Sequence, residues 1–257
     1  MARSGYGSKK KVLHHGASQL ASGGLDDASS FEVLGAIANY KTGDKEVRAG
    51  QDIVRLGERC DVIYALVAGW AFLYSLLQDG QRQILQFALP GALLGLDLLG
   101  GGHATYGVEA LTDVTVSILP QKALEPLSRN HPQIGLLLAG LASRDRLLSY
   151  DHLTSIGRRS AHERVAHLLL ELFVRSHAQW PGHLIEEMHL PLTQEHIGDA
   201  TGLTGVHVNR VLQDFRREKI VEFRYRRLRI RDPDRLADIA NIEPQMVRAW
   251  IRHRQPD

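Results

Sequence analysis

The sequence is poor in the residues that build several common kinds of site. Its 257 residues include one cysteine, Cys60, which excludes an internal disulfide and supplies too few thiolates for an iron–sulfur cluster or a structural zinc site. No apolar run approaches the ~20 residues of a membrane span, and the first thirty residues lack the apolar stretch of a secretory signal. We therefore expect a cytoplasmic protein with no membrane partner.

An excess of one charge is also lacking overall, because 31 Lys and Arg against 29 Asp and Glu leave a net charge of only +2. The distribution is uneven, however. Residues 210–231 contain nine Lys or Arg and only three acids. A basic stripe of this kind is typical of a surface that faces a polyanion such as nucleic acid.

The chain is long enough for two domains, and 44% of its residues are hydrophobic, as in a folded globular protein. Residues 1–30 are rich in Ser, Gly, Lys and Ala without periodicity, which predicts a flexible tail. Residues 31–130 begin with a short helical pattern at 31–40 and continue as short β-rich runs between regularly spaced glycines. That spacing is typical of a small sandwich or barrel.

Residues 131–157 have a helical pattern in which Ile134, Leu138, Leu141 and Leu148 follow steps of three and four. A helix of roughly 25 residues is ~38 Å long, more than a small domain needs to cover its own sheet. We expect these four residues to pair two copies in a homodimer. The simpler alternative is that they only cover the β domain.

Residues 158–257 contain two helical patterns around a glycine, followed by an arginine-rich alternating pattern and one or two further helices. Thr193 is placed to cap the first helix, Gly202 supplies the turn, and Thr204 is placed to cap the second helix. Such a hairpin need not bind DNA. The basic strands that follow predict a wing, and a wing beside a helix-turn-helix favours DNA.

The candidate DNA contacts lie on the two caps, the first turns of the second helix and the wing. Arg210 is suited to the O6 and N7 edge of guanine, Asn209 to adenine, and Val206 to a thymine methyl. His207 has solvent as an equal alternative to a base or a phosphate, and the wing arginines suit phosphates. The full set is Thr193, Gln194, Thr204, Val206, His207, Asn209, Arg210, Arg224 and Arg226.

The order of β-roll, long helix and winged helix-turn-helix resembles the Crp/Fnr family of bacterial transcription regulators over about residues 31–232. The resemblance is carried by Gly50, Gly57, Gly69, Gly80, Gly91 and Gly95, and later by Ile197, Gly198, Gly202, Val208, Arg210 and Leu212. It implies an α+β fold with an N-terminal double-stranded β-helix (jelly-roll) sensor domain, a long dimerisation helix and a C-terminal winged helix-turn-helix domain. It also implies a homodimeric regulator that binds near-palindromic double-stranded DNA, with RNA polymerase and an unknown small-molecule effector as further candidate partners.

The candidate effector pocket departs from the cyclic-AMP-binding members of that family. Their pocket glycine precedes a glutamate, whereas Gly95 precedes Leu96, and Thr105 and Tyr106 stand where an Arg-Ser pair would hold the cyclic phosphate. Asp97 is the nearest substitute for the missing carboxylate, but no arginine matches the phosphate charge. We place the candidate pocket at these five residues and do not expect classical cyclic-AMP binding.

Other chemistries find few residues to support them. Haem would need ligands such as His14, His15, Cys60 or His103, and most of the thirteen histidines must be solvated or structural, so no cofactor is expected. A cupin-type metal enzyme needs clustered ligands, yet His103 is the one histidine within 45–119. We expect neither a metal nor catalysis, and a non-DNA nucleotide-binding signalling module stays open as the alternative function.

Overall fold

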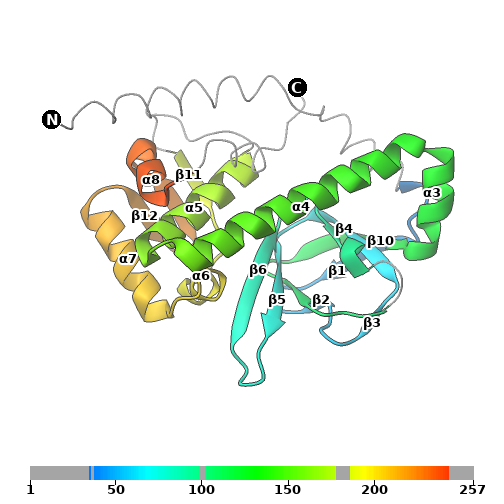
Figure 1. The fold of residues 1–257 in the computed structure, drawn as a ribbon, viewed down its shortest axis with the longest axis horizontal. Coiled ribbons are helices and arrows are strands. Elements are labelled where there is room, and N and C mark those ends of the chain that lie inside the picture. Colours follow the sequence, from blue (N-terminus) through cyan, green and yellow to red (C-terminus); the bar gives the residue numbers. More distant parts are fainter. Residues whose placement is uncertain (1–34, 36–37, 99–101, 178–185, 243–257) are drawn as a thin grey trace.

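The computed structural model describes residue 35 and residues 38–98, 102–177 and 186–242. These residues form an α+β protein in which a β-roll and a helical domain are joined by one long helix (Figure 1). The fold class expected from the sequence is therefore confirmed. The tail expected at 1–30 lies outside the described residues, as does the C-terminal extension beyond residue 242.

The N-terminal part is a roll of short antiparallel strands in two four-stranded sheets, and strands distant in sequence lie side by side in both. The first sheet has the order β1 (Gly43–Val47), β10 (Val114–Pro120), β4 (Val62–Ala68) and β7 (Leu93–Leu94). The second has the order β2 (Asp52–Val54), β9 (Gly107–Ala110), β5 (Ala71–Leu76) and β6 (Arg82–Ala88). A separate pair joins β3 (Arg59–Cys60) to β8 (Gly102–His103), and η1 (Leu96–Leu98) follows β7.

The turns of the roll depend on the regularly spaced glycines noted in the sequence. All six have a positive φ: Gly50, Gly57, Gly69, Gly80, Gly91 and Gly95. Only glycine adopts this conformation without steric cost. At Gly69 a side chain is excluded for a second reason, because its Cβ would lie 2.3 Å from the carbonyl oxygen of Asp113.

The second sheet of the roll is apolar on both faces because side chains alternate along its strands. On β5, Ala71 belongs to the cluster inside the roll, which also contains Leu66 and Val116 of the first sheet. The neighbouring Phe72 points the other way and joins a cluster shared with the C-terminal helices. This second face is the reason that the helical domain packs directly on the roll.

The long helix connects the two parts (Figure 1). A turn, η2 (Gln121–Ala123), and the short helix α3 (Leu124–Asn130) lead into α4 (Pro132–Arg158), which begins with a proline in its first turn. At 1.5 Å per residue its 27 residues extend for about 40 Å. This helix lies where the sequence led us to expect one, at 131–157.

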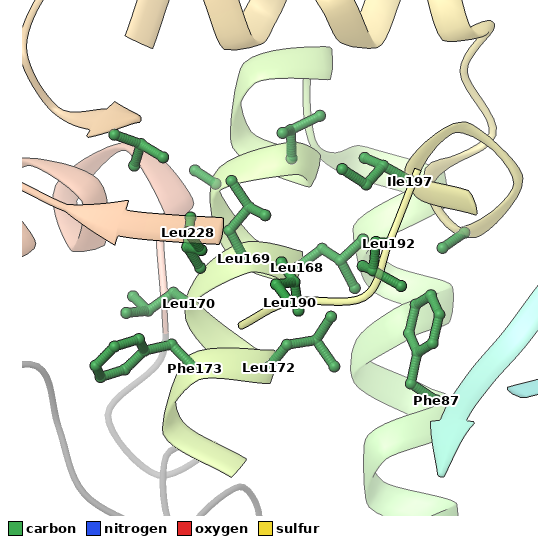
Figure 2. Packing of buried hydrophobic residues seen from close by; sticks show 14 of the residues in the cluster. Phe87, Leu168, Leu169, Leu170, Leu172, Phe173, Leu190, Leu192, Ile197 and Leu228 are labelled. Carbon is green, nitrogen blue, oxygen red and sulfur yellow. The ribbon is translucent and has the colours of Figure 1, made fainter. Parts of the chain in front are cut away.

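Within its described residues, the C-terminal part packs four helices around a small antiparallel sheet. The helices are α5 (Ala161–His177), α6 (Gln194–Thr201), α7 (Gly205–Arg217) and α8 (Pro233–Ala240), and the sheet has the order β11 (Glu186–His189), β13 (Arg227–Ile230), β12 (Val221–Arg224). Figure 2 shows Leu169, Leu172 and Phe173 of α5 among the side chains of the buried cluster, and each is fully buried. Phe87 of the roll reaches the same cluster (Figure 2). The two parts therefore share one core.

Candidate nucleic-acid interface

Helix α6, the first helix of the predicted pair, is fixed at its start by reciprocal hydrogen bonds. The Oγ1 of Thr193 accepts from the backbone N–H of His196 at 3.1 Å, and the backbone N–H of Thr193 donates to His196 Nδ1 at 3.3 Å. This is a capping box in which a histidine replaces the usual Glu or Gln. Burial, helped by the charge of Arg82, lowers the pKa of His196. The lowered pKa favours the neutral ring, in which Nδ1 can accept a hydrogen bond.

The turn between the helices requires two glycines. Gly202 ends α6 in the left-handed conformation, with φ 66° and ψ 36°, as expected for a glycine that terminates a helix. Gly198 has no room for a side chain, because a Cβ there would lie 2.5 Å from the carbonyl oxygen of Leu203. The two helices can approach this closely only with glycine at position 198.

Helix α7 has one buried face and one free face. Its start is capped by Thr204, whose Oγ1 accepts from the backbone N–H of His207 at 3.2 Å. Its inward side chains, Val208, Val211, Leu212 and Phe215, are buried in the domain core. Its exposed side chains include Val206, His207, Arg210 and Gln213, and Val206 is 66% exposed despite being apolar. Three predicted DNA contacts therefore share the solvent face of one helix.

Asn209 lies between two glutamines rather than standing free. Its Oδ1 accepts from Gln194 Nε2 at 3.4 Å and from Gln213 Nε2 at 3.5 Å. A bidentate pair with adenine needs both ends of the amide, so Asn209 would have to exchange these partners to read a base. The sequence analysis did not include Gln213. Its position one turn beyond Asn209 on the same helix is the signal that could have found it.

The predicted wing is present as the hairpin β12–β13. Its strands are joined by two residues, Tyr225 and Arg226, and the register places Arg224 opposite Arg227. Tyr225 is 95% exposed, and Arg224 and Arg226 are exposed on either side of it. The tip of the wing is therefore a solvated aromatic ring between two arginines.

Six arginines of the basic stripe differ in whether an acid pairs with them. Three of them form ion pairs with N–O distances of 2.7 Å: Arg217 with Asp214, Arg227 with Glu187, and Arg231 with Glu222. Arg210, Arg224 and Arg226 are exposed, and none of these three forms an ion pair with any residue that the structure describes. Their charges remain available to an anionic partner.

Three of the five candidate effector residues come together in the roll. The hydroxyl of the buried Tyr106 donates to the Asp97 carboxylate and also lies beside the backbone of Gly95. Burial, followed by the bond to Asp97, raises the pKa of Tyr106. Leu96 packs in a different cluster, beside α3 and α4, and Thr105 is exposed. The candidate carboxylate is thus already occupied by a phenol of the same chain.

An ion pair that the sequence did not predict links the roll to helix α6. The Nε of Arg82 on β6 donates to Asp199 of α6 at 2.9 Å, and its Nη1 donates to Glu109 of β9 at 3.3 Å. The guanidinium also lies 5.0 Å from the ring centre of Phe72. Arg82 and Asp199 are 117 positions apart, so no local pattern could have revealed their pairing.

The four residues that we expected to pair two copies do not share a free face of α4. The expectation that these particular residues form the dimer contact is therefore corrected. Ile134 and Leu148 are 1% and 5% exposed and lie in the chain's own clusters, and Leu138 packs against the same cluster as Ile134. Leu141 is half-buried. Ile134, Leu138 and Leu148 therefore attach α4 to its own protomer, as the simpler alternative held. The large exposed apolar residues of α4 are Leu136, Leu147, Tyr150 and Leu153.

The residues considered as haem or metal ligands do not form a cluster within the described part of the chain. Cys60 is buried, and its Sγ donates to the Val62 carbonyl at 3.3 Å, whereas His103 is exposed. His14 and His15 lie outside the described residues. Within the described part of the chain, no group of three or more His, Cys, Asp or Glu is placed to hold a metal ion. In that same part, none of the helices has the length and apolarity needed to cross a membrane.

In the comparison with known proteins, each half of the chain matches a family model. A model of the cyclic nucleotide-binding domain matches residues 44–131, and a model of the Crp-like helix-turn-helix domain matches residues 163–239. The transcriptional activatory protein AadR of Rhodopseudomonas palustris is 34% identical over 217 residues, which cover 84% of this chain and 86% of that protein. The nitrogen fixation regulation protein FixK of Rhizobium meliloti is 31% identical over 206 residues, or 80% and 87% of the two chains.

Solved structures agree with these relatives. The structure of FixK2 from Bradyrhizobium japonicum matches with a TM-score of 0.68 and 31% identity, covering 76% of this chain and 96% of that one. The chain therefore belongs to the Crp/Fnr family of bacterial transcription regulators.

Proposed function

We propose that the protein acts as a homodimer that binds a near-palindromic DNA site through α7 and the β12–β13 wing. The observation that carries this proposal is the outer face of α7. The helix is capped by Thr204 and buried on its inner side, yet it exposes Val206, His207 and Arg210 to solvent. Exposing an apolar residue beside an unpaired arginine does nothing for the isolated domain, but it suits a helix that lies in a major groove.

The residues of this face would have different tasks. Arg210 reads guanine through O6 and N7, and Val206 contacts a thymine methyl. Gln213 is exposed and suits adenine, while Asn209 fixes its orientation through the 3.5 Å hydrogen bond. Thr193 and Gln194, at the start of α6, would contact phosphates, as helix N-termini do in general.

Pairing of two copies would use a stripe of α4 that faces away from the protomer. Alternating steps of four and three connect exposed or half-buried residues along it: Leu136, Gly140, Ser143, Leu147, Tyr150, Thr154 and Gly157. This is the spacing of a coiled-coil seam. The space outside Gly140 and Gly157 is open, because a Cβ there would meet nothing within 4 Å. Since glycine has no side chain, a second α4 helix could approach closely at these two positions. Such a dimer would set its two α7 helices about one DNA turn, ~34 Å, apart.

The roll would not act as a cyclic-AMP receptor. Leu96 replaces the carboxylate that the resemblance requires, and Asp97 is engaged by Tyr106. Any other small-molecule effector would work only through a difference in its affinity for the DNA-competent and incompetent arrangements. RNA polymerase is the protein partner that a regulator of this family is proposed to contact.

The DNA proposal is tested by selecting bound duplexes from random DNA and titrating them by fluorescence anisotropy at moderate salt. Arg210→Ala should weaken binding to the selected site by ~1–3 kcal/mol and binding to random DNA by much less. An equal loss on both duplexes would reduce Arg210 to a phosphate contact. Failure to enrich any sequence would overturn the proposed function.

The dimer proposal is tested by light scattering on the full chain. Leu147, a seam residue that is 45% exposed, is changed to arginine, with Leu77→Arg on the roll, at a site 60% exposed, as the matched control. A charge within a helix seam opposes its burial, so Leu147→Arg should be monomeric and Leu77→Arg dimeric. A dimeric Leu147→Arg variant would contradict this seam.

A further inference from the structure

The tip of the wing has a backbone conformation that its residues do not favour. Tyr225 and Arg226 have φ values of 51° and 59° and form the two-residue loop of the hairpin. Loops with two positive φ values normally carry Asn-Gly or similar residues, because a bulky side chain there meets steric resistance. An aromatic residue followed by an arginine is therefore a poor choice for the turn itself.

The fold gains no compensation from these side chains. Tyr225 is 95% exposed, so its ring contributes almost no packing. The backbone is held independently, because the N–H of Leu190 donates to the carbonyl of Arg226 at 2.8 Å. Neither turn preference nor packing accounts for the two residues, and an outlier of this kind points to a role in binding.

The charges at the tip are also unfavourable in the isolated protein. Arg224 lies directly opposite Arg227 in the hairpin, and like charges at facing positions destabilise a strand pair. Glu187 neutralises Arg227 at 2.7 Å. Arg224 and Arg226 form no ion pair within the described part of the chain. A strongly anionic partner would remove this repulsion.

We propose that Arg224, Tyr225 and Arg226 enter the DNA minor groove beside each half-site and favour an A·T-rich groove there. The inference rests on the proposed function, with α7 in the major groove and the wing following directly after it. The minor groove is only about 6 Å wide, and a two-residue tip is a narrow element able to enter it. A narrow A·T-rich groove has an enhanced negative potential that attracts arginine.

Tyr225 distinguishes this mode from simple phosphate binding. Phosphate contacts require only positive charge, which Arg224 and Arg226 would supply without an aromatic ring between them. An exposed ring can insert beside the base edges, as the wedges of other minor-groove proteins do. Its hydroxyl can donate to adenine N3 or thymine O2, the acceptors in that groove.

The test uses the full chain and fluorescent duplexes that carry a site selected from random DNA. The base pairs that flank each half-site are set to A·T, G·C or I·C, where I is inosine. An I·C pair lacks the guanine amino group in the minor groove but keeps the major-groove pattern of G·C. We expect A·T and I·C flanks to bind about fivefold more tightly than G·C flanks.

The matched variant is the double substitution Tyr225→Asn with Arg226→Gly, which installs a turn that hairpins favour. It should melt no earlier than the wild type, as measured by circular dichroism, and should lose the preference between flanks. Arg216→Ala, which removes an exposed charge outside the wing, should weaken binding on all three flanks and keep their ratio.

Equal wild-type affinities on the three flanks would overturn the inference, and so would I·C flanks that behave like G·C flanks. In both cases the wing would contact phosphates or the major groove only. Failure of the proposed function looks different, because scrambling the half-sites would then leave the affinity unchanged. A site-dependent but flank-independent affinity refutes the minor-groove inference alone.

Discussion

The close contact inside the helix pair permits a sharp prediction for Gly198→Ala. The new Cβ would lie 2.5 Å from the carbonyl oxygen of Leu203, whereas ordinary contacts begin at 3.4 Å. The obstacle is backbone, so α6 and the turn must separate by almost 1 Å. That movement also strains the 3.0 Å hydrogen bond from the Leu203 N–H to the Gly198 carbonyl.

The expected change in stability follows from three contributions. Overpacking costs about 1–3 kcal/mol, and a weakened hydrogen bond costs up to about 1 kcal/mol. Alanine recovers roughly 1 kcal/mol through its higher helix propensity. The net loss in the free energy of unfolding should therefore be about 2 kcal/mol, and the displaced α7 should lower specific DNA affinity.

The control is Gly205→Ala at the start of α7, where a Cβ would meet nothing within 4 Å. This variant should be as stable as the wild type or up to about 1 kcal/mol more stable, because only the propensity changes. Urea denaturation followed by circular dichroism compares the two variants. If Gly198→Ala and Gly205→Ala unfold at the same urea concentration, the reasoning from the close approach is refuted.

The remaining predictions concern the ion pairs that hold the domains together. Asp151 is buried against Arg159 and His167 at 3.3 and 2.9 Å; burial alone raises its pKa, but the hydrogen bonds and charges of His167 and Arg159 outweigh this and lower it. Its stabilisation is therefore full above the ordinary carboxyl pKa of about 3.9 and is lost as pH falls through the lowered value. Asp151→Asn should lower the free energy of unfolding, measured in urea near pH 7, by about 3 kcal/mol. The stability of this variant should also fall less steeply than that of the wild type as the pH is lowered, and an equally steep fall would count against this explanation. Arg82→Ala should lower the free energy of unfolding by about 1 kcal/mol and speed amide hydrogen exchange in α6. The control Arg55→Ala, which removes an ion pair at the exposed surface, should change neither quantity.

The helix pair was predictable because its signals are local. Thr193 and Thr204 can accept from backbone N–H groups three residues later, and Gly202 can adopt the left-handed turn, whatever the rest of the chain does. The glycine turns of the roll are local in the same way. Even the close approach at Gly198 lies within five residues of its obstacle, Leu203.

The sequence by itself determined the main elements and their order, because caps, turn glycines and alternating apolar residues act over a few positions, and that order carried the resemblance to the family. Only the tertiary structure decided which side of α4 faces inward. When a helix has apolar residues on two sides, both sides follow the same spacing in the sequence, so the spacing does not tell which side is buried. Ile134 and Leu148 are buried while Leu147 and Leu153 are exposed because of where the roll and α5 pack. The link between Arg82 and α6 likewise needed the fold, since it is the folded chain that brings these charges together.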